Sequence, residues 1–588
     1  MLNKIISYII SGTDILLFGL IGVVLVYATT LDIIIPETIF FKFVMFTAAA
    51  FLLQYLLPRP FIRKILIMPL AAGLFYMLPI PVIACYTGQI LNCHHDIFFG
   101  MYLTLFLGNV RELLIPVRDS RTGKAAFIVF SALMAGLALL PLANIIHCCM
   151  YGINISEASV FALLDTDLRE SLEYVKSYFS LSSVLLMAAL FAGATCLLGR
   201  LDYGLVKKSQ LYAAPRRSKV YICLCLFVLG TVLFSSLLQK TLPLKLLHAV
   251  KRYRAETASF RENNQKVADD IKLIGTKPDE AEEASSVILV IGESACRDYM
   301  KAFTPSFSCD DTPWLSRMKA DPDFLLFKNA YACFNQTVPC LVRALTEASQ
   351  YNKKSFVDSA TVINAARKLG YKTYWFTNQG RTGVNDANIT MIAETADCMK
   401  GRAGGDVGYD HDLIDQFKAI KYGARNFIVF HLMGSHIDFV NRYPKSCAVF
   451  KGGRCAEYAN SILYTDCFLQ QLYEYAKKNL NLRAMIYFSD HGDDYASERH
   501  PDVFNIHTLR IPLFMYLSPE YQREHQDKFR QLRLHMDQYF TNDMIYNTLC
   551  GMLSGESNHY DKSEDLSSPA YAYNKNNIRC LGKPVKYY

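Results

Sequence analysis

Before residue 240 the sequence is dominated by apolar runs, each long enough to cross the roughly 30 Å hydrocarbon core of a membrane. Six runs are clear, at 14–34, 38–57, 65–85, 126–148, 182–200 and 220–238. A seventh, at 97–115, is weaker because Arg111 and Glu112 interrupt it. Only 19% of the 588 residues are charged. This pattern excludes a disordered chain and a plain cytosolic enzyme, and it predicts a transmembrane domain over residues 1–239.

Lysine and arginine gather in alternate loops between these runs. The segments 59–64, 118–124 and 200–219 are basic, whereas 35–37 and 86–96 contain no Lys or Arg. Basic loops stay in the cytoplasm, so seven spans place the N-terminus inside and the C-terminal part outside. Six spans do not keep all the basic loops inside, and five are left open if two weak runs do not cross. We predict an α-helical transmembrane domain of five to seven helices, and we attribute the net charge of +8 to membrane topology, with no nucleic-acid partner.

The rest of the chain has the composition of a globular protein. Residues 240–284 combine an amphipathic juxtamembrane helix with a polar linker. From 285 to 588, β-rich runs alternate with helical patterns; the runs are SSVILVIG, YKTYWF, NFIVFHL, RAMIYFS and IPLFMYL. This alternation predicts an α/β domain with a mainly parallel sheet. Since ligands collect at the carboxyl ends of such strands, the polar residues that follow the runs should converge on one rim. These residues are Glu293, Asn378, His431, Asp490 and His491.

Ten of the seventeen cysteines lie in this α/β domain, and none belongs to a C-x-x-C pair. A structural zinc knuckle is therefore poorly supported. An exported domain lies in an oxidising compartment, where disulfides persist. The pairs Cys447–Cys455 and Cys333–Cys340 are close enough in sequence to form local disulfides.

The sharpest chemical pattern is RAMIYFSDHGDD, an apolar strand that runs into Asp490, His491 and Gly492. Asp and neutral His are both zinc ligands, and Gly492 permits the turn that brings adjacent ligands to one ion. An isolated D-H-G is more often structural than catalytic, but its place after an apolar strand in an exported α/β domain reverses that preference. Glu293 follows the strand VILVIG in the same way, and it fits a third oxygen ligand or a helix-capping partner equally well.

Thr337 precedes a helical run in NQTVPCLVRALT. Position alone favours an N-cap. A hydroxyl at a helix N-terminus is also well placed to attack phosphorus, because the helix dipole and unpaired N–H groups stabilise phosphate there. A bound zinc ion would activate that hydroxyl as a nucleophile.

These elements, in this order, resemble the membrane-bound phosphoethanolamine transferases of the Gram-negative envelope, within the alkaline phosphatase–sulfatase superfamily. The resemblance extends over nearly the whole chain. Its motifs are G-E-S-x-x-R at 292–297, Thr-Pro at 312–313, W-F-x-N-Q at 375–379, H-L-x-G-S-H at 431–436, R-Y-P at 442–444 and S-D-H-G at 489–492. It implies an alkaline-phosphatase-like catalytic domain in the periplasm, attached to a multi-pass domain in the bacterial inner membrane.

The resemblance also implies site residues. A zinc site would comprise Glu293, Thr337, Asp490 and His491, with Thr337 as the nucleophile. One or two Zn²⁺ ions are expected, with Mn²⁺ less favoured. Histidines on the substrate side would be His436 and either His500 or His507. Further substrate contacts are expected from Asn378, Gln379, Asp167 and Glu170, the last two near a lipid headgroup. The Cys447–Cys455 spacing also fits a family disulfide.

The implied reaction moves phosphoethanolamine from phosphatidylethanolamine, through a phosphothreonine-type intermediate, to a lipopolysaccharide-type acceptor, either lipid A or a core sugar. The Y-G-Y segment common in the family is replaced by KAFTPSFSCDD, which leaves the acceptor open. The alternative is a transferase for glycerol phosphate or another phosphoalcohol with the same metal–threonine core. A sulfatase is disfavoured because TVPCLVR lacks the C-x-P-S-R motif. A catalytically inactive sensor or scaffold is disfavoured because Glu, Thr, Asp and His are all retained.

Overall fold

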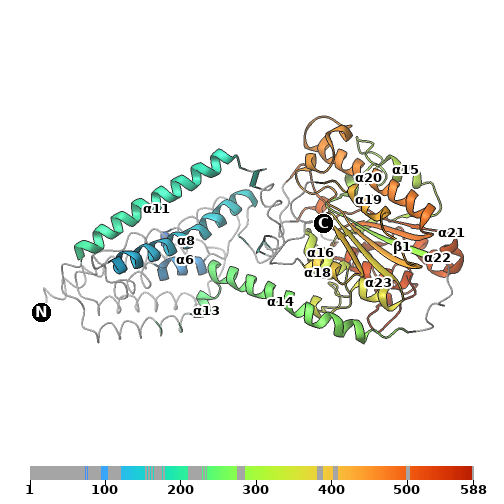
Figure 1. Cartoon of the computed structure of the whole chain (residues 1–588), viewed down its shortest axis with the longest axis horizontal. Helices are drawn as coiled ribbons and strands as arrows, with labels where there is room; N and C mark the ends of the chain where they lie inside the picture. The colour runs from blue at the N-terminus through green and yellow to red at the C-terminus, as the bar shows by residue number, and fades with distance from the viewer. Residues whose placement is uncertain are drawn as a thin grey trace. The chain divides into compact units, whose positions relative to one another are not determined.

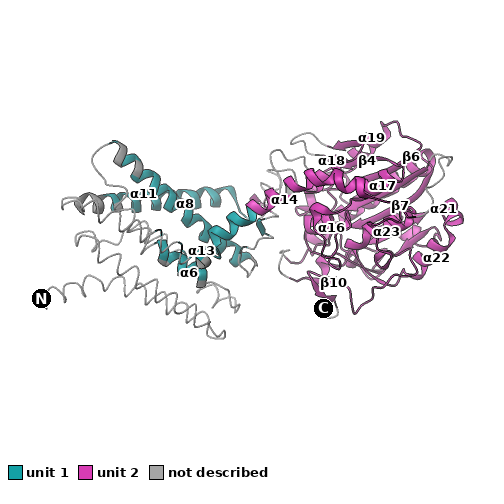
Figure 2. Ribbon diagram, turned by 90° about the horizontal axis from the view of Figure 1, so that it is seen from below, with its two compact units in different colours: residues 1–160, 179–250 teal, residues 161–178, 251–588 magenta. Residues whose placement is uncertain are grey.

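The computed structural model describes most of the chain after residue 235 and parts of it before (Figure 1). The described ranges are 94–103, 121–151, 179–209, 235–274, 285–379, 388–401, 408–497 and 504–585, with isolated positions before 235. Contacts divide the chain into two compact units (Figure 2). Unit 1 comprises Met1–Val160 and Phe179–Val250, and unit 2 comprises Phe161–Tyr178 and Lys251–Tyr588. The predicted boundaries at 239 and 284 remain predictions.

Among the residues of unit 1 that the structure describes, two helices are long and apolar enough to cross a membrane. In α8 (Arg121–Tyr151) this stretch is Phe127–Met150, and in α11 (Leu181–Ser209) it is Leu181–Leu201. Both have a mean hydropathy of 2.1, and they match the predicted runs 126–148 and 182–200. Shorter helices are α6 (His94–Met101) and α13 (Ser235–Leu238).

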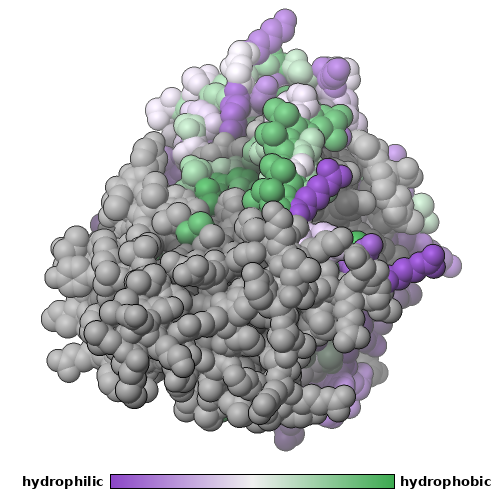
Figure 3. All heavy atoms as spheres, turned by 90° about the vertical axis from the view of Figure 1, so that its left-hand side faces the viewer, coloured by the Kyte–Doolittle hydropathy of each residue, from purple (hydrophilic) through white to green (hydrophobic). Residues whose placement is uncertain are grey.

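Large apolar side chains of α11 are exposed, among them Leu185, Leu190 and Leu197. Hydrophobic residues also lie at the surface in the described part of the face in Figure 3. Exposed apolar helix faces of this kind suit a lipid environment. The predicted runs at 14–34 and 38–57 lie outside the described residues, and those at 65–85, 97–115 and 220–238 lie mostly outside them. The number of spans therefore stays a prediction.

Helix α14 (Leu242–Asp270) occupies the segment predicted as juxtamembrane. Within unit 2 it packs through Phe260, which is buried and stacks on Phe356 with ring centroids 4.6 Å apart. Just beyond the helix, Leu273 forms a β-bridge with Ser557. These contacts attach the end of α14 to the α/β domain.

A seven-stranded sheet forms the centre of unit 2, in the order β2-β8-β7-β1-β6-β4-β5. The strands are β1 (Ser285–Gly292), β2 (Phe324–Leu326), β4 (Lys372–Thr377), β5 (Cys398–Gly401), β6 (Arg425–His431), β7 (Leu482–Ser489) and β8 (Leu513–Leu517). The β8 strand is antiparallel to both of its neighbours, and the other pairs are parallel. The five predicted runs correspond to β1, β4, β6, β7 and β8, so the predicted α/β domain is confirmed, with a mixed sheet.

Two small sheets lie beside this one. They pair β3 (Asn329–Tyr331) with β9 (Tyr539–Thr541) and β10 (Arg579–Cys580) with β11 (Lys583–Pro584). The helices of the domain are α15 (Pro313–Met318), α16 (Thr337–Ala344), α17 (Val362–Lys368), α18 (Asn388–Glu394), α19 (Asp412–Lys418), α20 (Gly453–Asn479), α21 (Pro519–Glu524), α22 (Gln526–Leu534) and α23 (Ile545–Met552).

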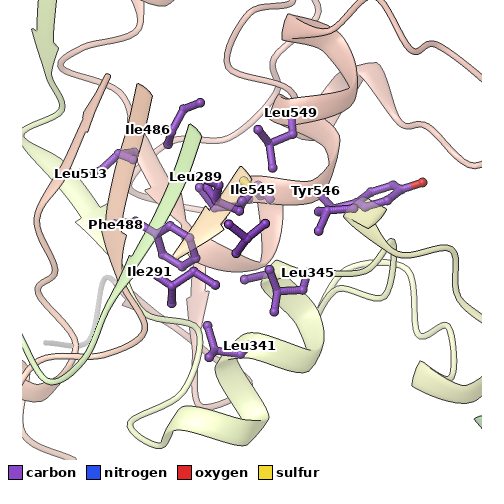
Figure 4. Close-up of a cluster of buried hydrophobic side chains, with 14 of the residues drawn as sticks. Leu289, Ile291, Leu341, Leu345, Ile486, Phe488, Leu513, Ile545, Tyr546 and Leu549 are labelled. Atoms are coloured by element: carbon purple, nitrogen blue, oxygen red, sulfur yellow. The ribbon is translucent and has the colours of Figure 1, made fainter. Parts of the chain in front are cut away.

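Helices cover both faces of the large sheet, because alternate residues of the buried strands point to opposite sides. On one face Leu289 and Ile291 pack with Leu341 of α16 and Leu549 of α23 (Figure 4). On the other face Val290 joins a second cluster, built from α15, α19 and α20. The result is a three-layer α/β/α domain.

The strand register brings the carboxyl ends of the central strands to one edge. Gly292 pairs with Ser489, and both Ile291 and Thr377 pair with His431. The residues that follow β1 and β7 are therefore neighbours, as predicted from the strand pattern.

The two predicted disulfides are not formed. Cys333, Cys340, Cys447 and Cys455 are all free thiols. The Cys340 thiol donates a hydrogen bond to the carbonyl of Phe334, 3.0 Å away. It is thus directed at the backbone of the preceding turn. Cys455 lies in the first turn of α20, and Cys447 lies in a separate 3₁₀ turn.

Candidate active site

Two carboxylates lie side by side at this edge of the sheet. Glu293 follows β1 and Asp490 follows β7, with 1% and 0% of their surfaces exposed. Ser294 connects them, since its N–H donates to Asp490 Oδ1 at 3.0 Å and its hydroxyl donates to Glu293 Oε1 at 2.7 Å. Ser294 has a φ of 59°, a left-handed conformation that is unusual for serine. Backbone strain at this turn accompanies the close approach of two acidic groups.

Asp490 is held by one of its two oxygens. Oδ1 accepts the N–H groups of Ser294 and His491, whereas buried Oδ2 has no hydrogen-bond donor among the described residues. The side chain of Asn542 donates to the Asp490 carbonyl at 2.6 Å and fixes the backbone. Burial raises the pKa of Asp490. A cation beside Oδ2 would offset this cost of desolvation.

The ring of His491 is oriented by its own backbone. Nδ1 lies 2.8 Å from the carbonyl of Gly492. Because a carbonyl only accepts, Nδ1 carries a proton, and Nε2 presents its lone pair in the neutral ring. Nε2 lies 3.2 Å from Asp490 Oδ2, 3.4 Å from Glu293 Oε1 and 3.3 Å from Thr337 Oγ1.

Thr337 is the first residue of α16, and its hydroxyl faces this cluster. The N-cap residue is Gln336, which makes no side-chain cap, so Thr337 is not the cap. Its Oγ1 donates to Glu293 Oε2 at 3.1 Å. The first N–H groups of a helix have no acceptor within the helix and therefore favour an anion at this end.

Four ligand-type groups thus converge, and their chemistry fits a metal ion. Glu293, Asp490 and His491 offer ligand atoms that all lie within 4.8 Å of one another. A positive charge among them would stabilise two buried carboxylates that face a neutral imidazole nitrogen. Carboxylate oxygen and imidazole nitrogen are the donors that zinc accepts. The buried Asp490 Oδ2, which lacks a donor among the described residues, suits such an ion.

The turn that carries His436 is built against Glu293. Ser435 N donates to the Glu293 carbonyl at 2.9 Å. Asp410 accepts the N–H groups of Met433 and Gly434, both at 2.9 Å. Burial raises the pKa of Asp410, and these amide hydrogen bonds oppose that rise.

Asn378 and Gln379, predicted as substrate contacts, direct their amide groups at the protein. The Asn378 side chain donates to Asp410 Oδ1 at 2.8 Å, and that of Gln379 donates to the Leu432 carbonyl at 2.7 Å. Both therefore support the turn before His436. The predicted substrate contacts of the two residues stay predictions.

Gly434→Ala is expected to disturb this turn and lower activity. A Cβ at this position would lie 2.7 Å from the Glu293 carbonyl oxygen and 2.9 Å from its nitrogen, and the φ of +49° also disfavours alanine. We expect a loss of about 1–3 kcal/mol in unfolding free energy and slower turnover. Denaturant unfolding and transfer rates measure both effects. Gly370→Ala is the control, because it has a φ of +82° but open space around its Cβ. If turnover falls equally in both variants, backbone strain and not the Glu293 contact is responsible.

His431, expected on the rim, lies in the core. Its ring is buried and packs edge-on against Trp375 at 6.4 Å. Burial lowers its pKa to about 3, so the ring is neutral. His431 is the last residue of β6, and its ring is not exposed at the site.

Of the remaining predicted residues, His507 lies among those that the structure describes. His507 lies 2.9 Å from Asp298 through Nδ1. His500, Asp167 and Glu170 lie outside the described residues. Three supporting residues were missed, namely Ser294, Asp410 and Asn542. Ser294 could have been predicted from the G-E-S motif. Asp410 and Asn542 lie far along the chain from the groups that they hold.

Comparison with known proteins gives consistent matches. Residues 285–547 match the family model described as Sulfatase. The chain is 26% identical over 488 residues to phosphoethanolamine transferase EptC of Escherichia coli, and this match covers 76% of the chain and 82% of the relative. It is 25% identical, with the same coverage, to phosphoethanolamine transferase CptA of Salmonella typhimurium.

A solved membrane protein shares the fold over most of the chain. It is the integral membrane lipooligosaccharide phosphoethanolamine transferase A of Neisseria meningitidis, with a TM-score of 0.55 and 14% identity. The match covers 85% of this chain and 97% of that one. At this identity the likeness concerns the fold alone.

Proposed function

The chain belongs to the membrane-bound phosphoethanolamine transferases of the alkaline phosphatase–sulfatase superfamily, and on this premise we propose the course of its reaction. It transfers phosphoethanolamine from phosphatidylethanolamine to a lipopolysaccharide-type acceptor, lipid A or a core sugar, with Thr337 as the covalent carrier. The names of the relatives support the transferred group, and the site geometry supports the carrier.

The observation that carries this proposal is the position of the Thr337 hydroxyl. Oγ1 lies 3.1 Å from Glu293 Oε2 and 3.3 Å from His491 Nε2, at the N-terminal end of α16. A nucleophilic oxygen, a proton acceptor and an anion-stabilising helix end are thus combined at one point. Glu293, Thr337, Asp490 and His491 would hold zinc, which would lower the pKa of the hydroxyl and neutralise charge on the phosphoryl oxygens.

In the first half-reaction, Thr337 Oγ1 forms a bond to phosphorus and the bond from phosphorus to the diacylglycerol oxygen breaks. The proton leaves Oγ1 for Glu293 Oε2, the acceptor 3.1 Å away, and is then passed to the departing diacylglycerol oxygen, so that Glu293 ends as a carboxylate again. In the second half-reaction, an acceptor hydroxyl loses its proton and bonds to phosphorus, while the Oγ1–phosphorus bond breaks and Oγ1 regains a proton. No net proton is released. His436 and His507 are the proposed proton carriers.

The membrane domain suits a lipid donor. We place it in the bacterial inner membrane with the catalytic domain in the periplasm, supported by the spans in α8 and α11 and by the basic loops of the sequence. A site tethered at the membrane surface meets its lipid substrate at high effective concentration.

The test is intact mass of the purified full-length chain in detergent, after incubation with phosphatidylethanolamine and zinc. We expect a covalent increment of one phosphoethanolamine group, located on Thr337 by peptide mapping, which is released when an acceptor is added. An increment only with phosphatidylglycerol would favour the glycerol-phosphate alternative. No increment and no transfer with either lipid would contradict both.

A further inference from the structure

We propose that Asp298 is a positioning residue for His507, holding its ring in the tautomer that leaves Nε2 able to accept a proton from the incoming acceptor. The inference rests on the transfer reaction proposed above and adds to it a residue outside the zinc-type cluster. Asp298 comes directly after the G-E-S-x-x-R segment, and His507 lies 209 positions further along the chain.

The contact between the two side chains assigns the tautomer. His507 Nδ1 lies 2.9 Å from Asp298 Oδ2. Since an ionised carboxylate only accepts hydrogen bonds, the proton of the neutral ring sits on Nδ1 and the lone pair on Nε2. The Tyr299 ring stacks on the imidazole at 5.0 Å and 29°. The Tyr299 hydroxyl is fixed in turn, because it donates to Asp494 Oδ1 at 3.0 Å. The ring of His507 is thus held both at its edge and on its face.

The turn that carries His507, with the residues just after it, is hydrogen-bonded to the segments that follow β1 and β7. It spans Ile506–Thr508. Gly492, next to His491, donates its N–H to the Thr508 carbonyl at 2.8 Å, and Arg297 donates its N–H to the Arg510 carbonyl at 3.1 Å. The side chains of Asp298 and His507 are 20% and 34% exposed. A substrate group can therefore reach the pair, which is still shielded enough for a directed hydrogen bond to hold.

Arg510 supports the carboxylate. Its Nη1 lies 3.1 Å from the same oxygen, Asp298 Oδ2. A guanidinium at this distance forms a charge-assisted hydrogen bond with the carboxylate and restricts its rotation. Asp298 then stabilises the positive charge that His507 gains when it takes up a proton, as in other Asp–His pairs.

A metal site is the competing interpretation, because Cys296, Asp298 and His507 offer ligand atoms within 4.8 Å of one another. Burial raises the pKa of the Cys296 thiol, which favours the protonated, weakly ligating form. Asp298 Oδ2 is already engaged by Nδ1 and by Arg510. The observed contacts therefore favour the Asp–His pair.

The proton path balances in the second half-reaction. The acceptor hydroxyl gives its proton to His507 Nε2 as its oxygen bonds to phosphorus and the Thr337 Oγ1–phosphorus bond breaks. The same proton is then passed on to Oγ1, which restores both residues.

A double-mutant cycle on the full-length, zinc-loaded chain tests this inference. Asp298→Asn is expected to lower kcat by about 10²-fold, with KM changed less than about twofold. His507→Gln should lower kcat at least as much. The double variant should be no slower than His507→Gln alone, because Asp298 acts through His507. Zinc content and thermal midpoint should match wild type in each. Asp527→Asn, which removes an exposed carboxylate paired with Arg530, is the matched control and should transfer normally.

Three results would overturn the inference. The first is normal kcat in Asp298→Asn, and the second is multiplicative losses in the double variant. The third is loss of bound metal in Asp298→Asn, which would favour the metal site. Should Asp298→Asn not fold, Asp298→Glu keeps a carboxylate for Arg510, and its cycle with His507→Gln must show the same non-additivity. If the wild-type chain forms no adduct and transfers nothing, the proposed function itself is contradicted. If the wild-type chain is active and Asp298→Asn is equally active, only the role of Asp298 is contradicted.

Discussion

Thr337→Ala is expected to abolish transfer, lowering the rate by at least about 10³-fold, and to remove the covalent adduct. The substitution deletes the one hydroxyl that lies between Glu293 Oε2 and His491 Nε2. It should leave the fold intact, because Gln336 is the N-cap of α16 and Thr337 makes no capping hydrogen bond. Intact mass after incubation with phosphatidylethanolamine, with unfolding followed in parallel, measures both expectations.

Two further variants make this result specific. Thr337→Ser keeps Oγ and should retain a measurable adduct. Thr395→Ala removes a hydroxyl that donates to the Ile392 carbonyl in its own turn, and it should transfer normally. An adduct that persists in Thr337→Ala would assign the nucleophile to another group. Ser294 is the first candidate, since its hydroxyl lies 2.7 Å from Glu293 Oε1.

The residues that follow the strands could be predicted from the sequence because parallel strands end at one edge. Glu293 and Asp490 each follow a run of apolar residues, and the pairing of Gly292 with Ser489 makes them neighbours. The apolar runs therefore predicted that Glu293, Asp490 and His491 would meet at this edge. Thr337 follows no strand of the large sheet, so its place depended on the family resemblance.

The supporting contacts could not be predicted, because they join segments with no common pattern. Asp298 and His507 are 209 positions apart and meet through a 3₁₀ turn. Asn542 reaches the Asp490 carbonyl across 52 positions. The disulfide predictions failed for a related reason, since sequence spacing says nothing about the direction of a thiol. The Cys340 thiol is directed at the Phe334 carbonyl, in the turn that precedes α16.

Chelation of zinc is expected to abolish transfer and to destabilise the catalytic domain, and Asp490→Asn should reproduce the first effect without the second. At a free zinc concentration about 1,000 times the dissociation constant, binding adds about 4 kcal/mol to the unfolding free energy, which chelation removes. Chelation also leaves the carboxylates of Glu293 and Asp490 without a cation, although only 1% and 0% of their surfaces are exposed. Thermal unfolding with and without chelator measures the loss.

Asp490→Asn separates the charge of the ligand from its shape. The amide oxygen can still accept the N–H groups of Ser294 and His491 that bond to Oδ1 in the wild type. One buried negative charge is gone, so the variant should bind zinc more weakly, transfer at least about 10³-fold more slowly and unfold at the same temperature with or without chelator. Asp537→Asn, an exposed carboxylate paired with Lys328, should respond to chelator like wild type. Undiminished zinc in Asp490→Asn would contradict Asp490 as a ligand. Normal zinc with lost transfer would instead assign Asp490 to the chemistry, because Oδ2 and His491 Nε2, 3.2 Å apart, would then share a proton and not an ion.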